Sequence, residues 1–93
     1  IKGKEMKMEK LKVGSGTKPN LAAGAIAGII RRDKKLEIQA IGAGAANQSI
    51  KAVAIARGYV AASGLDIICR PAFINIDTGD KETTALKIMV EAL

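Results

Sequence analysis

Apolar and polar residues alternate with a period of two near the start of the chain, and the period then becomes that of a helix. Residues 10–13 alternate lysine with leucine and valine, which predicts a short half-exposed strand. After glycines at residues 14 and 16, Thr17 is expected to cap a helix that has Pro19 in its first turn and runs to about Arg32. The apolar stripe expected for this helix is Leu21, Ala22, Ala25, Ile26, Ile29 and Ile30.

A second strand and a long second helix follow. Residues 36–41 alternate and predict a strand, and residues 45–62 predict a helix that stops before Gly64, a residue suited to a left-handed helix end. One apolar face of this helix consists of Ile50, Val53, Ala56 and Val60, and another of Ala52, Ile55, Tyr59 and Ala62. Because a helix that is apolar on two sides needs two surfaces to cover it, we expect a homodimer in which a second copy covers one of them.

The last third of the chain predicts two more strands. Residues 65–76 form a strand interrupted at Pro71, which suggests an edge, a bend or a bulge, and alternation resumes around residues 84–90 after a turn at residues 77–80. The order βαβαββ predicts a two-layer α/β sandwich of the α+β type, with both helices packed on one face of a four-stranded mixed sheet. We expect the final hairpin to add an antiparallel edge to that sheet.

The charge is concentrated in the first third of the chain. The sequence has 93 residues, 15 of them basic and 9 acidic, and residues 1–35 contain ten of the basic and three of the acidic ones. A local positive field of this kind favours a polyanionic partner such as nucleic acid. Residues 1–8 are expected to be a basic extension, either a tag remnant or disordered, and residues 9–93 a single domain.

Composition also restricts the compartment and the chemistry. The single cysteine, Cys69, lies inside an apolar run and indicates a reducing cytosol. The sequence contains no run of 18 apolar residues, so it predicts no membrane-spanning helix. We therefore expect a cytoplasmic protein that can associate with the nucleoid. The chain has no histidine, and its carboxylates lack the paired spacing of acid and base catalysis. We expect no enzymatic activity, no metal site and no cofactor.

A glycine turn follows the second predicted strand and opens the second helix. It consists of Gly42, Ala43, Gly44, Ala45, Ala46 and Asn47, followed by Gln48. The setting is that of a dinucleotide-binding fingerprint, but Asn47 replaces the third glycine of that motif. Three readings stay open: a tight turn in which Asn47 or Ser49 satisfies backbone donors, a contact with the phosphates of a nucleic acid, and a site for a free nucleotide.

Basic residues flank the first strand and the first helix and form the second candidate site. They are Lys12, Lys18, Arg31, Arg32, Lys34 and Lys35. Lysine beside a glycine-rich loop can hold phosphate, whereas nothing in the set reads bases. Because Tyr59 and Phe73 are the only aromatic residues, we expect binding through backbone charge and shape without sequence readout.

The run from Glu37 to Gly58 strongly resembles the stage V sporulation protein S family. The shared residues are Glu37-Ile38-Gln39-Ala40-Ile41-Gly42-Ala43-Gly44-Ala45, Asn47-Gln48 and Ile50-Lys51-Ala52-Val53-Ala54-Ile55-Ala56-Arg57-Gly58, with Pro19-Asn20 and Pro71-Ala72-Phe73 outside the run. The resemblance implies an Alba-like fold, whose members are dimeric nucleic-acid binders, and a regulatory role in sporulation or cell development.

Two positions bear on function within that resemblance. Lys18, just before Pro19, matches the lysine with which Alba-type proteins contact DNA backbone, whereas the arginines that such proteins often carry after the second strand are Gly42 and Gly44 here. The leading hypothesis is sequence-tolerant binding of DNA or RNA by a dimer. The alternatives are a regulatory module that contacts other proteins, and a small-nucleotide sensor at the glycine turn.

Overall fold

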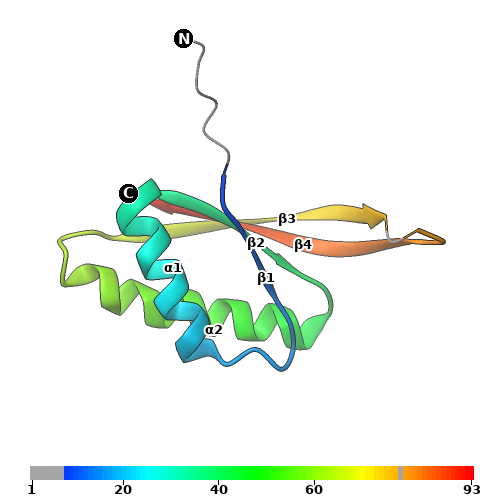
Figure 1. The fold of residues 1–93 in the computed structure, drawn as a ribbon, viewed down its shortest axis with the longest axis horizontal. Coiled ribbons are helices and arrows are strands. Elements are labelled where there is room, and N and C mark those ends of the chain that lie inside the picture. The colour runs from blue at the N-terminus through cyan, green and yellow to red at the C-terminus, as the bar shows by residue number, and fades with distance from the viewer. Residues whose placement is uncertain (1–7, 78) are drawn as a thin grey trace, which may run out of the picture.

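The structure, a computed structural model, describes residues 8–77 and 79–93. Its elements in chain order are β1 (Lys10–Val13), α1 (Pro19–Asp33), β2 (Lys35–Ala40), α2 (Ala43–Ala61), β3 (Ile67–Asp77) and β4 (Glu82–Ala92) (Figure 1). This is the predicted βαβαββ order. The charged residues at positions 1–7, which contribute to the predicted basic extension, lie outside the described residues.

The four strands form one mixed sheet in the order β1-β2-β4-β3. β1 and β2 are parallel, and β4 runs antiparallel to both of its neighbours. As expected, the final hairpin adds an antiparallel edge to the sheet, because the connection from β2 through α2 skips one position and the hairpin returns β4 into the gap. β3 is the edge strand, and its unbroken register with β4 across Pro71 shows an edge without a bulge.

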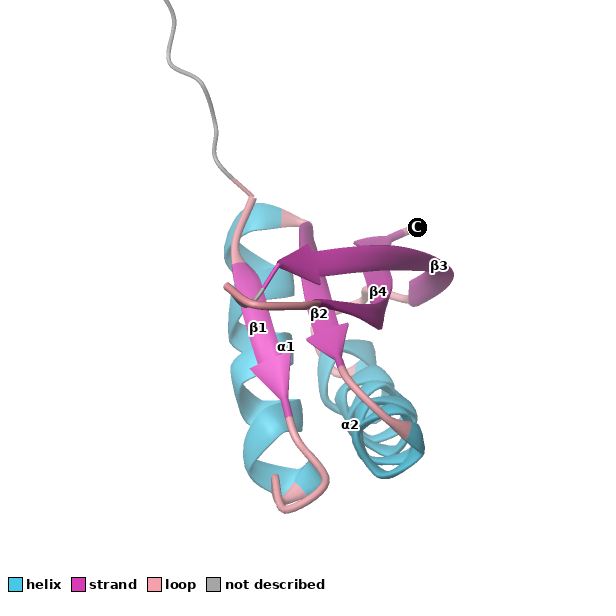
Figure 2. Cartoon of the chain, turned by 90° about the vertical axis from the view of Figure 1, so that its right-hand side faces the viewer, coloured by secondary structure: helices cyan, strands magenta, loops and turns pink. Residues whose placement is uncertain are grey.

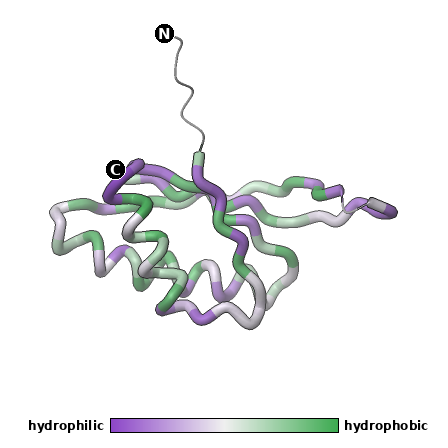
Figure 3. Tube along the Cα trace, viewed as in Figure 1, coloured by the Kyte–Doolittle hydropathy of each residue, from purple (hydrophilic) through white to green (hydrophobic). Residues whose placement is uncertain are grey.

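Both helices pack on one face of the sheet, as predicted (Figure 2). The core lies between the two layers, and its largest fully buried side chains are Ile26, Ile30, Leu36, Ile38, Ile88, Val60 and Val90. The far end of the β3–β4 hairpin is predominantly hydrophilic (Figure 3). The hairpin therefore extends beyond the part of the sheet that the helices cover (Figure 1).

The apolar faces of the helices differ in part from those predicted. On α1, Leu21 is 72% exposed, and the buried positions are Ala22, Ala23, Ile26, Ala27 and Ile30, because only this side of the helix faces the second layer. On α2, Ile50 is 52% exposed although it was expected beside the buried Val53. The second predicted face of α2 is also mixed, since Ala52 is fully buried whereas Tyr59 is 43% exposed.

The residues at the helix ends agree in part with the predicted caps. Lys18 is the N-cap of α1 and Thr17 is not, because the Thr17 hydroxyl is used one turn earlier, where it accepts a hydrogen bond from the Gly14 amide at 2.9 Å. Lys34 ends α1 in the left-handed region with φ of 71°. α2 begins at Ala43, two residues before the predicted start, and Gly64 after its end has the expected positive φ of 78°.

Candidate nucleic-acid interface

The loop between β1 and α1 docks on the first turns of α2. Within the loop, the Thr17 amide donates to the Gly14 carbonyl at 3.1 Å, which closes a tight turn. The Gln48 side chain on α2 donates from Nε2 to the Thr17 carbonyl at 2.9 Å. Gln48, predicted as a binding residue, therefore fastens the loop to the helix and fixes the backbone from which Lys18 projects.

The two glycines of the predicted turn have different tasks. A Cβ atom on Gly44 would lie 2.8 Å from the Cβ of Ser15, closer than such atoms approach in proteins, so Gly44 is needed for the loop to reach the helix. Ser15 thus fills the space beside Gly44. Gly42 has open space around it and a φ of 93°, a backbone conformation that side chains rarely adopt.

The N-terminal amides of α2 are left without side-chain partners. Gly42 is the N-cap, no side chain caps the helix, and the first turn contains no acidic residue. The reading in which Ser49 satisfies these donors was wrong, because Ser49 is buried and its hydroxyl donates to the Ala45 carbonyl at 2.8 Å. Asn47 is exposed and makes none of the caps either. This end of the helix therefore keeps its positive partial charge.

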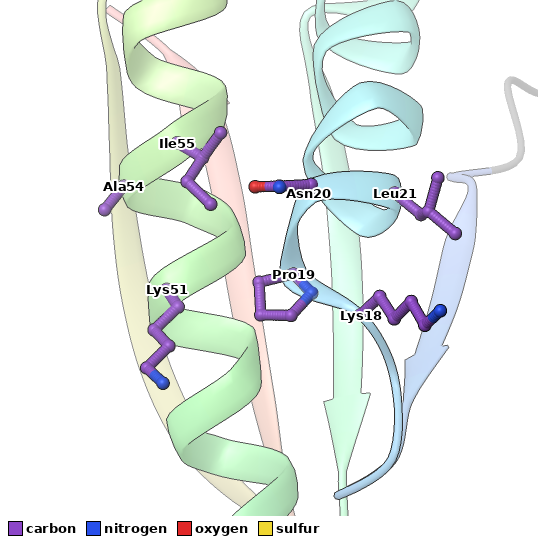
Figure 4. Close-up of a pocket in the computed structure, with 7 residues that line it drawn as sticks. All are labelled: Lys18, Pro19, Asn20, Leu21, Lys51, Ala54 and Ile55. Carbon is purple, nitrogen blue, oxygen red and sulfur yellow. The ribbon is translucent and has the colours of Figure 1, made fainter.

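Two of the predicted lysines stand at the ends of the docked loop. Lys12 lies in β1 before the loop and Lys18 caps α1 after it, and both are exposed. Neither forms an ion pair with any residue that the structure describes. Figure 4 shows the Lys18 side chain extending towards β1, the strand that carries Lys12. The two ends of the loop thus carry two uncompensated ammonium groups, while the middle of the loop contacts the first turns of α2.

Two further lysines lie near a predicted one and were missed in the sequence: Lys51 near Lys18 in the helix layer, and Lys87 in the row of Lys12 on the sheet face that the helices leave uncovered. Lys51 lies on α2, across from Pro19 in Figure 4, and Lys87 lies on β4 opposite Gln39, which has Lys12 opposite it on its other side. For Lys51 the helical period was a usable signal, because it lies one turn after Asn47. For Lys87 no local signal exists, since only the strand order brings it into the same row as Lys12.

The remaining predicted cations lie at the opposite end of α1. Arg31, Arg32, Lys34 and Lys35 occupy its last turn and the start of β2. A helix of 15 residues is about 22 Å long, so this group is separated from Lys18 by the length of α1. The predicted basic set is therefore divided into two groups on the folded chain, of which only Lys12 and Lys18 adjoin the glycine turn.

The two arginines of the second group make contacts within the fold. Arg31 donates to the Ser63 hydroxyl at 3.1 Å and to the Tyr59 carbonyl at 3.0 Å, which ties the end of α1 to the end of α2. Arg32 pairs with Asp33 at 3.0 Å, and the hydrogen bond from Arg32 lowers the pKa of the Asp33 carboxyl. These arginines are fastened in place, in contrast to the lysines beside the loop.

The described residues contain no group of three histidine, cysteine or carboxylate side chains placed to hold a metal ion. Asp66, one of the carboxylates, accepts from Arg57 at 2.7 Å, and this hydrogen bond, together with one from the Ile67 amide, lowers the pKa of Asp66. Among the residues that the structure describes, neither helix has the length and hydrophobicity of a membrane-spanning helix.

The sequence model of the family described as Stage V sporulation protein S (SpoVS) matches residues 9–93. The match covers nearly the whole chain, so the chain belongs to this family, and the resemblance predicted from the run between Glu37 and Gly58 is confirmed. Membership gives the protein a sporulation-related role.

Proposed function

We propose that this member of the stage V sporulation protein S family acts by binding DNA or RNA through the phosphate backbone, as a dimer and without catalysis. One observation carries the proposal: the β1–α1 loop, which has Lys12 and Lys18 at its two ends, docks on the uncapped first turn of α2, and neither lysine pairs with a carboxylate among the described residues. Phosphate is the anion for which lysines and helix N-termini together are suited.

Sequence tolerance follows from the kind of donors at this surface. Ammonium groups and backbone amides contact phosphate oxygens, which are the same on every nucleotide. The two aromatic side chains of the sequence are not beside Lys18, since Tyr59 is on the last turns of α2 and Phe73 is on the edge strand. We therefore expect affinity that depends strongly on salt and weakly on sequence.

The experiment is a fluorescence anisotropy titration with duplex DNA, single-stranded DNA and RNA in one buffer at about 50 mM salt and upward. The wild-type protein should bind, and Lys18→Glu should weaken binding to every sequence alike. Lys35→Glu is the matched control, because it makes the same charge change at an exposed residue at the far end of α1. No binding at low salt, or equal loss in both variants, contradicts the proposal.

For the dimer we propose a surface that includes Phe73 and Ile50. Phe73 is 78% exposed and adjoins Ala43 and Ala46, and Ile50 follows Ala46 by one turn of α2. Large exposed apolar side chains on neighbouring elements favour a contact with another protein. Because most soluble oligomers are symmetric homo-oligomers, we propose a second copy of this chain as that partner. Sedimentation equilibrium should give the mass of two chains for the wild type and of one for Phe73→Glu. A single-chain mass of the wild type at all concentrations rules the dimer out.

A further inference from the structure

A cavity lies on the face of the sheet that the helices leave uncovered. Its lining comes from β1, from β2, from the residues just after them and from the far end of β3, namely Lys12, Val13, Gly14, Gln39, Ile41 and Ile76. Lys12 and Gln39 alternate with buried core residues of their strands, so their side chains point away from the helices. The volume is about 410 Å³, and ligand pockets in proteins have volumes of about 300–1,000 Å³.

The curl of the sheet makes this face hollow. β1 and β3 are the two edge strands, with β2 and β4 between them, yet Lys12 of β1 and Ile76 of β3 line the same cavity. In a flat sheet the two edges would be about 14 Å apart, because neighbouring strands are about 4.8 Å apart. In Figure 2 the β3–β4 hairpin runs across the direction of β1 and β2. The hairpin therefore forms one wall of the cavity, and the ends of β1 and β2 form the other.

The cavity combines apolar walls with one positive charge. Val13, Ile41 and Ile76 supply the apolar surface, and Ile41 is 51% exposed, so half of its surface is open to water. Lys12 is exposed and forms no ion pair with a residue that the structure describes. The lining residues include no carboxylate, so the Lys12 ammonium is the one charge among them.

Gln39 is held in position and keeps a hydrogen for a ligand. Its Nε2 donates to Oε2 of Glu37 at 2.8 Å. A side-chain amide nitrogen carries two hydrogens, so the second one can be donated to an acceptor in the cavity. Glu37 itself is buried and does not line the cavity. The polar part of the lining therefore consists of donors.

We propose that this cavity binds a small carboxylate with an apolar body. The carboxylate pairs with Lys12 and accepts a hydrogen bond from Gln39, and the apolar body lies against Ile41 and Ile76. The charge favours a carboxylate over a phosphate monoester, because one ammonium balances one negative charge and a phosphate monoester carries about two at neutral pH. An anion without an apolar body would leave both isoleucines in water, so it gains less from binding.

The bound carboxylate should weaken nucleic-acid binding, because Lys12 serves both ligands. This consequence rests on the proposed function, whereas the binding of the carboxylate does not. With Lys12 neutralised in both chains of a dimer, about two fewer counterions are released, so the slope of log K against log salt should become shallower by about 1.8. An unchanged slope with the carboxylate bound refutes the contact of Lys12 with nucleic acid and not the cavity.

The probe for the test is octanoate, titrated into the full chain and followed by amide chemical shifts. The shifts should saturate and should be concentrated at residues 12–14, 39–41 and 76. Octanamide has the same body without the charge and should bind about tenfold more weakly. Acetate has the charge without the body and should also bind more weakly. The proposal is overturned if either control binds as tightly as octanoate, if the shifts do not saturate, or if they lie between the two helices.

Two pairs of variants test the charge and the apolar wall separately. Lys12→Gln should weaken octanoate about tenfold, whereas Lys10→Gln, the same change on the same strand and face but outside the lining, should leave its affinity unchanged. Ile76→Ser should also weaken octanoate about tenfold, and Ile74→Ser, two residues earlier on the same face, should not.

Equal effects within either pair overturn the proposal. A lower sedimentation mass of Ile76→Ser than of the wild type also overturns it, because a second copy then occupies the cavity. Circular dichroism checks the fold of each variant. Lys12 is exposed, so the comparison of Lys12→Gln with Lys10→Gln still decides the matter if Ile76→Ser does not fold.

Discussion

Gly44→Ala is the substitution that tests the docked loop most directly. The added Cβ would lie 2.8 Å from the Cβ of Ser15 and 3.6 Å from its Cα. Carbon atoms in contact are about 3.5–4.0 Å apart, so the loop has to retreat by about 1 Å. The atom in the way is close to the backbone of Ser15, and it cannot rotate aside as the end of a long side chain could.

The energetic cost has two parts and one compensation. Forcing one extra carbon into a packed contact costs about 1–3 kcal/mol. A loop that moves by about 1 Å also stretches the 2.9 Å hydrogen bond from Gln48 to Thr17, which is worth about 1 kcal/mol. The gain in helix propensity from glycine to alanine is at most about 1 kcal/mol, and smaller in a first turn. The net loss is at least about 1 kcal/mol, a fall of about 4–8 °C in the melting temperature for a chain of this size.

Thermal unfolding followed by circular dichroism measures the effect, and two variants serve as controls. Gly28→Ala makes the same change in α1 where no atom lies within 4 Å, so it should raise the melting temperature. Ser15→Gly in the Gly44→Ala background removes the opposing Cβ and should restore both stability and nucleic-acid affinity. If Gly44→Ala is as stabilising as Gly28→Ala, the loop does not rest on α2 as described.

Three further predictions concern single contacts. Lys34→Gly should raise the melting temperature, because a left-handed φ of 71° costs a non-glycine residue about 1–2 kcal/mol. Gln48→Ala should lower the free energy of unfolding by about 1 kcal/mol and weaken nucleic-acid binding, since it frees the Thr17 carbonyl from α2. The hydrogen bond from Arg57 holds the pKa of Asp66 below its ordinary value of about 4, so its stabilisation is present above that pH and is lost as pH falls through the lowered pKa. Urea midpoints of the wild type should therefore fall towards those of Asp66→Asn below about pH 4, and a constant gap between the two down to pH 2 contradicts the assignment.

Local patterns in the sequence were sufficient for the elements and insufficient for their arrangement. The alternation along residues 36–41 and the apolar spacing of both helices predicted the βαβαββ order, because each depends on neighbours two to four residues apart. The position of β4 could not be predicted in this way. Whether the last strand joins an edge or enters a gap depends on how far α2 crosses the sheet, and no period along the chain records that distance.

The candidate site shows the same division. Ser15 and Gly44 touch although they are far apart in the sequence, and nothing local signals their contact. Counting charges along the chain grouped Lys18 with Arg31, although a helix of 15 residues stands between them. The distance between Lys18 and Arg31 could have been predicted from the sequence, because the predicted helix between them already implied a separation of about 22 Å. The glycine turn was predicted correctly as a helix start. The need for glycine at position 44, however, follows from the contact with Ser15 in the β1–α1 loop, which only the structure shows.

The division of the basic residues gives the salt dependence a structural meaning. If each chain of a dimer contacts phosphates with Lys12, Lys18 and Lys51, about six counterions are released, and log K should fall with log salt at a slope near −5. If the two arginines and two lysines at the other end of α1 also contacted the nucleic acid, the dimer would neutralise about fourteen phosphates and the slope would approach about −13. Arg31 is held by Ser63 and Tyr59, so its binding of phosphate requires breaking contacts that join the two helices, and Arg32 would have to leave the neighbouring Asp33 carboxylate. The shallow slope is therefore the one that the fold favours, because Arg31 cannot turn to a phosphate without losing its contacts with the end of α2.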